Sequence, residues 1–385
     1  MEILSFIIPF IISIMEILSF IIPFIILITV VVFIHEYGHY YFAKHFGVGV
    51  TDFSIGFGKE IFGFDDKFGT RWKFCAIPLG GYVKFFGDRN VFSQAEQNEL
   101  LKKYNKKDQE KLFVTKPLYQ RSLIVAAGPF ANFILAIFIF SLIYMFAGKD
   151  FTPAHIQEVQ KDSPAFIAGV KKDDVILFIN KNEVKSILDV STYINASSKE
   201  TIELRVLRNN QELTIPVTPK IIKGKDSLGN NANKKIIGIK IAPPNNEFDK
   251  QKLGPTSALF YAVKETWFVT QTSLDFIFSM FKGKGDTTQL GGPIKIAKIT
   301  GQVAQYGLIA FLSIMAYISI SLGFINLFPI PLLDGGHLMF YAFEKVLGRP
   351  LKQKTQEGFF RIGLFLLFSL MFFTTFNDLK DLGLF

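Results

Sequence analysis

Residues 17–39 read ILSFIIPFIILITVVVFIHEYGH, an apolar run that ends in the motif His35-Glu36-Tyr37-Gly38-His39. A helix rises about 1.5 Å per residue, so roughly 20 apolar residues cross a bilayer core. The run therefore predicts a first transmembrane helix over residues 15–45. Residues i and i+4 lie above one another on one helix face, so both imidazoles can bind one metal ion. Glu36 lies beside that position and is the candidate general base, because it can take a proton from a bound water.

Three further segments, 122–148, 305–345 and 357–377, are predicted to span the membrane. No charged residue lies between Arg121 and Lys149, or between Lys298 and Asp334. The net charge is +9, from 42 Lys and Arg against 33 Asp and Glu. Because that charge lies in the loops and not in the apolar segments, it indicates membrane orientation, and no nucleic-acid partner is expected. The expected fold class is an α-helical polytopic membrane protein with about four transmembrane helices.

The positions of Lys and Arg predict the orientation, since these residues concentrate in cytoplasmic loops. None precedes Lys44, whereas residues 345–361 carry Lys and Arg at five positions against the single acid Glu357. The segment 46–121 is also basic. We therefore expect both loops on the cytoplasmic side, and both termini and residues 150–245 on the outer side.

The start of the chain contains a repeat. Residues 1–14 (MEILSFIIPFIISI) recur almost unchanged at 15–28 (MEILSFIIPFIILI). A straight helix over 1–34 would be about 51 Å long, too long for one crossing. The spanning part is therefore expected from about residue 15, with 1–14 as an interfacial extension or a duplication.

Two insertions differ from the apolar segments. Residues 150–245 alternate apolar and polar residues between turn signals, which predicts a small β-rich domain. Its stretch SPAFIAGVKKDD (163–174) resembles a PDZ domain of the bacterial protease type, with Asp173 and Lys181 in place of two usual glycines. The first tolerates a left-handed backbone better than the second. Residues 255–300 are predicted to be an amphipathic segment lying on the membrane surface.

Two histidines leave a zinc ion short of ligands, and Asp334 is the best third candidate. It follows a charge-free stretch and lies in Asn326-to-Gly336, NLFPIPLLDGG, whose prolines and glycines interrupt a helix. A His₂Asp set leaves a fourth position for water, as in catalytic zinc sites. His337 is the rival ligand. The remaining candidates, Cys75, His45 and His155, lie outside the apolar segments, and a single cysteine excludes a multi-thiolate site.

HEYGH in a first membrane helix together with NLFPIPLLDGG in a third resembles the site-2 protease family of intramembrane zinc metalloproteases. The segments IPLGGYVK (77–84) and AGPFAN (127–132) are also similar to that family. The glycine of the second segment is expected to serve close helix packing.

The resemblance implies that His35, His39 and Asp334 hold Zn²⁺, that Glu36 is the general base, and that residues 46–121 form a membrane-associated β-loop. It also implies substrate contacts at Asn326, Gly81 and Tyr82.

The implied activity is cleavage of transmembrane segments of membrane-anchored proteins, such as anti-sigma factors or remnant signal peptides. The implied location is the bacterial inner membrane, with the active site toward the cytoplasm and an upstream protease acting first. Two alternatives remain at this stage. A non-catalytic zinc-bound PDZ scaffold would not need Glu36, and a transporter would not need the HExxH spacing.

Overall fold

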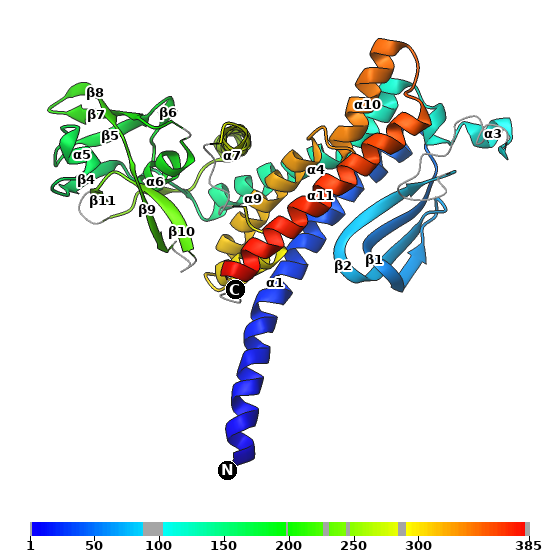
Figure 1. The fold of residues 1–385 in the computed structure, drawn as a ribbon, viewed down its shortest axis with the longest axis horizontal. Helices are drawn as coiled ribbons and strands as arrows, with labels where there is room; N and C mark the ends of the chain where they lie inside the picture. The colour runs from blue at the N-terminus through cyan, green and yellow to red at the C-terminus, as the bar shows by residue number, and fades with distance from the viewer. Residues whose placement is uncertain are drawn as a thin grey trace. The chain divides into compact units, whose positions relative to one another are not determined.

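The computed structural model describes residues 2–87, 103–197, 199–225, 231–243, 247–283 and 290–381. The chain divides into two compact units, which we describe separately (Figure 1). The first comprises Met1–Ile139 and Gly292–Phe376, and the second comprises Phe140–Gly291 and Asn377–Phe385. The first unit contains most of the long helices and a β-hairpin, and the second contains the small β-rich domain and one further long helix.

The helices that lie wholly or partly in the first unit are α1 (Glu2–His45), α3 (Lys106–Gln109), η1 (Phe113–Thr115), α4 (Leu118–Phe146), α8 (Pro293–Ala304), α9 (Leu308–Asn326), α10 (Asp334–Leu347) and α11 (Gln353–Asp381). Four stretches of the described residues are long and apolar enough to cross a membrane: Ile17–His45, Leu118–Phe146, Leu308–Asn326 and Lys354–Lys380. The four predicted spanning helices are therefore confirmed by length and composition. The last one is longer than the apolar run in the sequence, because polar residues extend it at both ends.

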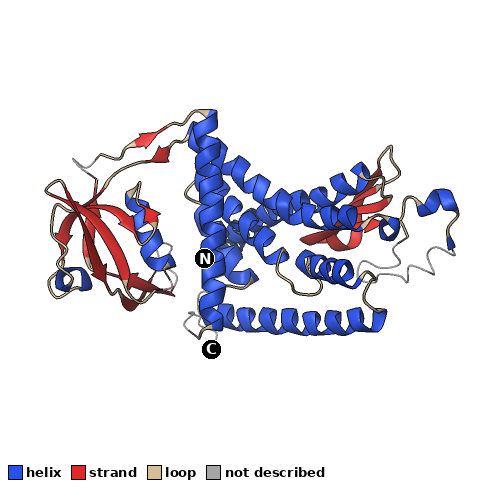
Figure 2. Ribbon diagram, turned by 90° about the horizontal axis from the view of Figure 1, so that it is seen from above, coloured by secondary structure: helices blue, strands red, loops and turns tan. Residues whose placement is uncertain are grey.

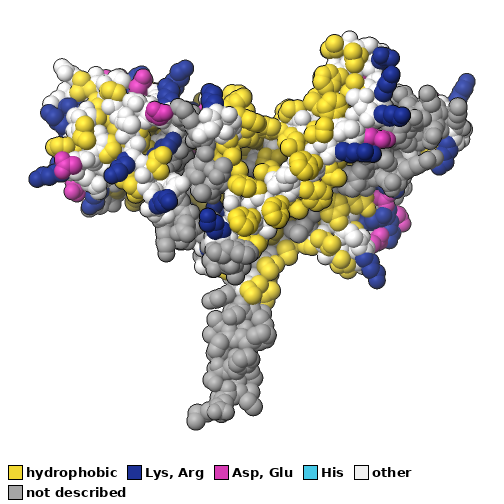
Figure 3. Space-filling model, viewed as in Figure 1, with side chains coloured by type: hydrophobic (Ala, Val, Ile, Leu, Met, Phe, Trp, Pro, Cys, Tyr) yellow, Lys and Arg dark blue, Asp and Glu magenta, His cyan; other side chains and the backbone are white. Residues whose placement is uncertain are grey.

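The outer faces of these helices are apolar. Figure 3 shows apolar side chains over much of the visible face of the first unit. On α11, Phe365 and Phe372 are 70% and 76% exposed, and Ile134 on α4 is 66% exposed. Large exposed apolar surface of this kind is typical of contact with lipid.

Helix α1 begins at Glu2, so the first copy of the repeat continues the helix. Its 44 residues correspond to about 66 Å, which is longer than one crossing. The candidate span begins only at Ile17, in agreement with the predicted start near residue 15.

The predicted third spanning segment, 305–345, consists of two helices with a break between them. Helix α9 ends at Asn326 and α10 begins at Asp334. Gly335 is needed at this junction, because a Cβ there would lie 2.2 Å from the Phe328 carbonyl oxygen. The break places the first residue of α10 inside the unit instead of at a helix end in solvent.

The hairpin between α1 and α4 is formed by β1 (Val50–Asp65) and β2 (Arg71–Phe85). Residues 50–55 pair with 81–85 on one side and with 71–74 on the other, while 60–65 pair with 71–75. The two bent strands thus form four segments in the order 60–65, 71–75, 50–55, 81–85. Segment 81–85 is an edge of this sheet. The β-loop expected in 46–121 is present, and its residues 88–102 lie outside the described part of the chain.

Asp66 joins the tip of the hairpin to α1. Its Oδ2 accepts hydrogen bonds from the Tyr40 hydroxyl at 2.8 Å and from the Trp72 indole N–H at 3.1 Å. Partial burial alone would raise the pKa of Asp66, but these bonds and those from the Thr70 and Phe68 N–H groups outweigh it and lower that pKa to about 2. The carboxylate is therefore ionised and able to accept these hydrogen bonds at neutral pH.

In the second unit, a stem of β3 (Lys149–Asp150) and β12 (Lys250–Gln251) carries the β-rich domain, and Figure 2 shows these short strands apart from the main sheet. The sheet order is β11-β4-β5-β7-β8, with β6 beside β5. The bounds of the remaining elements are β4 (Ala154–Val159), α5 (Pro164–Ile167), β5 (Val175–Ile179), β6 (Asn182–Glu183), α6 (Ile187–Ala196), β7 (Ile202–Arg208), β8 (Gln211–Val217), β9 (Lys220–Lys225), β10 (Asn231–Ile236) and β11 (Ile239–Ala242). This is the expected inserted PDZ-like domain.

Asp173 and Lys181, which stand where two glycines are usual, differ in backbone conformation. Asp173 has a φ of 70°, so it adopts the left-handed conformation that the usual glycine would adopt. At the second turn the left-handed residue is Asn180, with a φ of 54°, and not Lys181. Asn180 therefore takes the left-handed position of the second turn, because asparagine tolerates this backbone conformation better than lysine.

Helix α7 (Pro255–Phe281) packs one face on the PDZ-like domain. The rings of Tyr193 and Phe268 lie 4.9 Å apart, and Lys185 Nζ lies 3.4 Å from the Tyr261 hydroxyl. Apolar side chains on α7 remain exposed at helical spacing: Phe260, Val263, Trp267, Phe278 and Phe281. The helix predicted within 255–300 is present, and its location on the membrane surface stays a prediction.

Candidate active site

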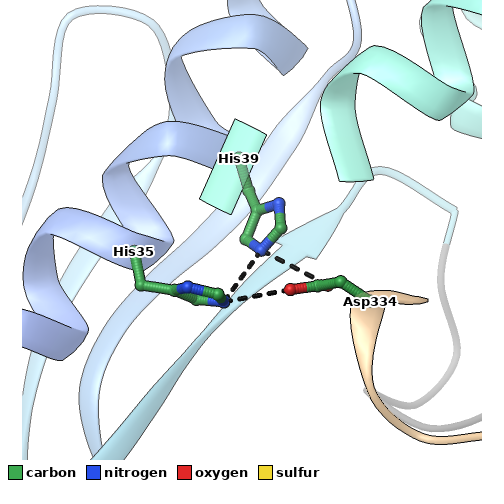
Figure 4. A group of neighbouring side chains, drawn as sticks. All are labelled: His35, His39 and Asp334. Carbon is green, nitrogen blue, oxygen red and sulfur yellow. Dashed lines mark hydrogen bonds and ion pairs between the residues drawn. The ribbon is translucent and has the colours of Figure 1, made fainter. Parts of the chain in front are cut away.

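Three side chains from two distant parts of the chain converge in the first unit (Figure 4). His35 and His39 project from the same face of α1, and Asp334 is the first residue of α10. His35 Nε2 lies 3.1 Å from one carboxylate oxygen of Asp334, and His39 Nε2 lies 3.5 Å from the other. The two Nε2 atoms are 3.3 Å apart. Both histidines are buried, with 7% and 9% of their surface exposed.

These distances fit a zinc ion. Zinc bonds to histidine nitrogen and carboxylate oxygen at about 2.0–2.1 Å, so neighbouring ligands of a tetrahedral ion lie about 3.3 Å apart. The three ligand atoms here all lie within 4.8 Å of one another. The residues His35, His39 and Asp334 form the only such group among the described His, Cys, Asp and Glu side chains. Three protein ligands leave a fourth position open, which is the arrangement of catalytic zinc sites.

Helix α4 supplies the surroundings of the two histidines. The Ile124 carbonyl oxygen lies 2.8 Å from His39 Nδ1, and the Asn132 side-chain amide lies 3.2 Å from His35 Nδ1. Gly128 lies between them, and a Cβ there would be 2.2 Å from His39 Nε2. Close packing at this glycine was expected, but the group packed against it is the imidazole of His39, whose Nε2 faces Asp334.

Residues 124, 128 and 132 are therefore site residues that the motifs alone did not identify. Their spacing of four places them on one face of α4, and AGPFAN contains two of them. That spacing was the available signal, but nothing in the sequence indicated which helix this face would contact.

Glu36 lies in a cavity of about 380 Å³ next to the three ligands. Its carboxylate accepts a hydrogen bond from the Val83 N–H on the edge segment of β2. Gly81 is also close to Glu36, because a Cβ added at Gly81 would lie 3.1 Å from Glu36 Cγ. The same Cβ would lie 2.6 Å from the Ser54 carbonyl oxygen of β1. The edge segment 81–85 therefore passes directly beside the candidate base.

The structure brings the other predicted site residues to the same cavity. Gly81, Tyr82 and Asn326 line it together with Glu36 and Asp334. The rival ligand His337 also lines the cavity but does not belong to the ligand group.

The remaining metal-ligand candidates lie elsewhere. Cys75 is buried in the hairpin with Sγ 3.3 Å from Ser54 Oγ. The ring of His45, at the end of α1, stacks on Tyr41, and His155 is in the PDZ-like domain.

Zinc metalloproteases bind the metal through the two histidines of a helical HExxH motif and a third ligand, which here is a carboxylate. They also leave one coordination position open and place a glutamate beside it. The site described above has these features. Comparison with known proteins agrees with this class. The profile of peptidase family M50 matches residues 23–370. The chain belongs to this family, the site-2 protease family of zinc metalloproteases.

Curated relatives match over almost their whole length. "Putative zinc metalloprotease mll0638" of Mesorhizobium japonicum is 40% identical over 356 residues, which cover 92% of this chain and 96% of the relative. "Metalloprotease MmpA" of Caulobacter vibrioides is 35% identical over 380 residues, covering 93% and 95%. Among solved structures, the PDZ domain of an SdrC-like protein from Listeria monocytogenes matches 24% of this chain and 88% of its own, with 21% identity and a TM-score of 0.20. The curated relatives thus agree with membership of a zinc metalloprotease family.

Proposed function

We propose that this protein is an intramembrane zinc endopeptidase that cleaves transmembrane segments of membrane-anchored proteins. The observation that carries the proposal is the convergence of His35, His39 and Asp334 beside Glu36, on two of the apolar segments predicted to span the membrane. Ionisable groups at such positions are costly and are usually functional. Anti-sigma factors and remnant signal peptides are the substrate examples that the family resemblance implies.

The residues of the cavity have distinct roles in this proposal. His35, His39 and Asp334 would hold the zinc ion, which when bound would supply Lewis-acid polarisation of the scissile carbonyl and lower the pKa of a water at the site. Glu36 lines the same cavity and would take a proton from the attacking water and deliver it to the leaving amine. The Val83 N–H orients the Glu36 carboxylate, and the Asn326 amide at the cavity wall is placed to hydrogen-bond the substrate backbone.

Removing the metal tests the proposal directly. We expect chelation to abolish cleavage of a transmembrane model substrate by the purified chain in vesicles, and stoichiometric zinc to restore it. Asp334→Ala removes one of three ligands and should lower both the zinc content and the cleavage rate. Glu344→Gln on the same helix is the control, because Glu344 pairs with Arg121 away from the cavity. Cleavage that persists in the zinc-free chain would contradict the proposal.

A helical substrate must unwind before its peptide bonds can be attacked, and the β2 edge offers a partner for the unwound strand. The Lys84 carbonyl oxygen accepts from the Thr51 hydroxyl on β1, whereas the Val83 N–H points to Glu36. Backbone groups of alternate residues in a strand point to the same side. The backbone groups of Gly81, Val83 and Phe85 therefore face the cavity, where we propose that an extended substrate pairs with Gly81, with Phe85 and with the Val83 carbonyl oxygen.

Modifying the substrate tests this pairing better than substituting Val83 would, because the Val83 N–H already bonds Glu36. We expect that N-methylation of single backbone nitrogens in a synthetic substrate lowers cleavage at every second position. The intervening positions should tolerate the methyl group, because their N–H groups point away from β2. If N-methylation lowered cleavage at consecutive positions instead of at every second one, strand pairing would be ruled out.

The orientation proposal follows from the charge distribution. We place the PDZ-like domain and both termini outside the bacterial inner membrane, and the active site toward the cytoplasm. A cysteine introduced at Lys171 or Lys250 should then react with a membrane-impermeant thiol reagent added from outside, and one at Lys352 should not. The native Cys75 is buried, so its background labelling is expected to be low. The reverse labelling pattern would overturn this orientation.

A further inference from the structure

Asn132 on α4 is wholly buried and contacts a candidate zinc ligand. Its Nδ2 lies 3.2 Å from His35 Nδ1. Its Oδ1 is also buried and has no hydrogen-bond partner among the described residues. A buried amide oxygen without a partner costs free energy, so this side chain needs an explanation beyond packing.

The protonation of a zinc-bound histidine supplies that explanation. A histidine that binds metal through Nε2 carries its proton on Nδ1 and donates it to an acceptor. His39 already has such an acceptor in the Ile124 carbonyl oxygen at 2.8 Å. At His35 the neighbouring group is the Asn132 amide. Since the amide NH₂ and oxygen have nearly the same shape, a half-turn of the amide brings Oδ1 to the position that now holds Nδ2.

We propose that Asn132 is a positioning residue for the metal site, whose Oδ1 accepts the Nδ1–H of His35 and thereby fixes the ring with Nε2 toward the zinc. This inference rests on the proposed ligation of zinc by His35. It adds a side chain of α4 to a ligand set drawn from α1 and α10, so that each histidine has its own acceptor on α4.

The surrounding contacts hold Asn132 in place for this role. The Ser319 hydroxyl on α9 donates to the Asn132 backbone carbonyl at 2.9 Å. Gly323, one turn further along α9, lies so close that a Cβ there would be 3.2 Å from the Asn132 Cβ. The backbone and Cβ of Asn132 are thus fixed by α9, and only its amide reaches His35.

The test compares zinc affinities of purified variants by competition with a chromophoric chelator. Asn132→Leu keeps the size but removes the acceptor, and we expect a 10–100-fold loss of zinc affinity. Asn132→Asp keeps an acceptor at the same place and should bind zinc within about threefold of the wild type, as carboxylate–histidine–zinc groups do. Ser321→Ala, also on α9, removes a hydroxyl that donates to the Tyr317 carbonyl oxygen of the same helix, and should leave zinc affinity unchanged.

The visible absorption of the cobalt-substituted protein provides a second readout of ligand geometry, which we expect to change in Asn132→Leu and not in Ser321→Ala. Equal affinities of Asn132→Leu and wild type, or equal losses in Asn132→Leu and Asn132→Asp, would overturn the proposal. If Asn132→Leu is not recovered folded, Asn132→Ala removes the amide without a branched side chain and takes its place in the comparison. His35→Ala tests the ligand set itself: if it retains wild-type zinc affinity, the proposed zinc site is wrong, whatever Asn132 does.

Discussion

Glu36→Gln is expected to abolish substrate cleavage while the protein still binds zinc. Glutamine has nearly the same shape as glutamate, and its side-chain oxygen can still accept the Val83 N–H. It cannot take a proton from water at neutral pH, so the general-base contribution of about 10²–10⁴-fold in rate should be lost. The three zinc ligands are unchanged, so metal content should stay at the wild-type level. The measurement is cleavage of a transmembrane substrate in vesicles, with zinc determined on the same sample.

Tyr37→Phe is the matched control for this experiment. Tyr37 is the next residue of α1 but points away from the cavity, with 41% of its surface exposed and its ring stacked on Phe33. Its variant should cleave at the wild-type rate. Full activity of Glu36→Gln would exclude Glu36 as the base. A wild type that binds zinc but cleaves no transmembrane substrate would instead fit the non-catalytic zinc-bound scaffold.

Gly128→Ala is expected to have the second large effect, which is loss of zinc binding. The added Cβ would lie 2.2 Å from His39 Nε2, 2.5 Å from Cε1 and 2.9 Å from Cδ2. Helix α4 has little room to move away from α1, because it also packs closely on α9, where a Cβ at Gly323 would lie 2.8 Å from the Pro129 carbonyl oxygen. Overpacking at such sites costs about 1–3 kcal/mol, and here it acts on the ligand nitrogen itself. We therefore expect zinc affinity to fall by roughly 10–100-fold or more, with cleavage falling in parallel.

Gly358→Ala is the control for the substitution itself. Gly358 lies in α11, and within the described part of the chain no atom outside its own helical turn lies within 4 Å of the position that its Cβ would occupy. Alanine in a helix is more stable than glycine by about 1 kcal/mol, so this variant should be folded and active. Unchanged zinc affinity in Gly128→Ala would show that the site can relax, and that Gly128 matters for helix packing only.

Much of the architecture could be predicted because it depends on local properties of the chain. Apolar length alone predicts the four spanning helices. The i, i+4 spacing places His35 and His39 on one helix face without any knowledge of their partners. Asp334 could be singled out because the prolines and glycines before and after it interrupt an otherwise charge-free segment. The structure places it 3.1 Å from His35.

The role of α4 could not be predicted in this way. Gly128 and Asn132 belong to an apolar helix in which a small residue and an amide are both common in close packing. Their importance depends on how closely α4 approaches α1, and that distance is decided by long-range packing. The same holds for Val83, whose bond to Glu36 requires β2 to fold back beside α1.

The sequence by itself determined the membrane helices, the metal-binding motif and the β-rich insertion, because hydropathy, helical periodicity and strand alternation are properties of neighbouring residues. Only the tertiary structure decided which groups surround the two histidines and which strand edge borders Glu36. These contacts join residues about 85–97 positions apart on α1 and α4, and about 50 positions apart on α1 and β2. Their spacing in the chain carries no period, so only the packed fold brings them together.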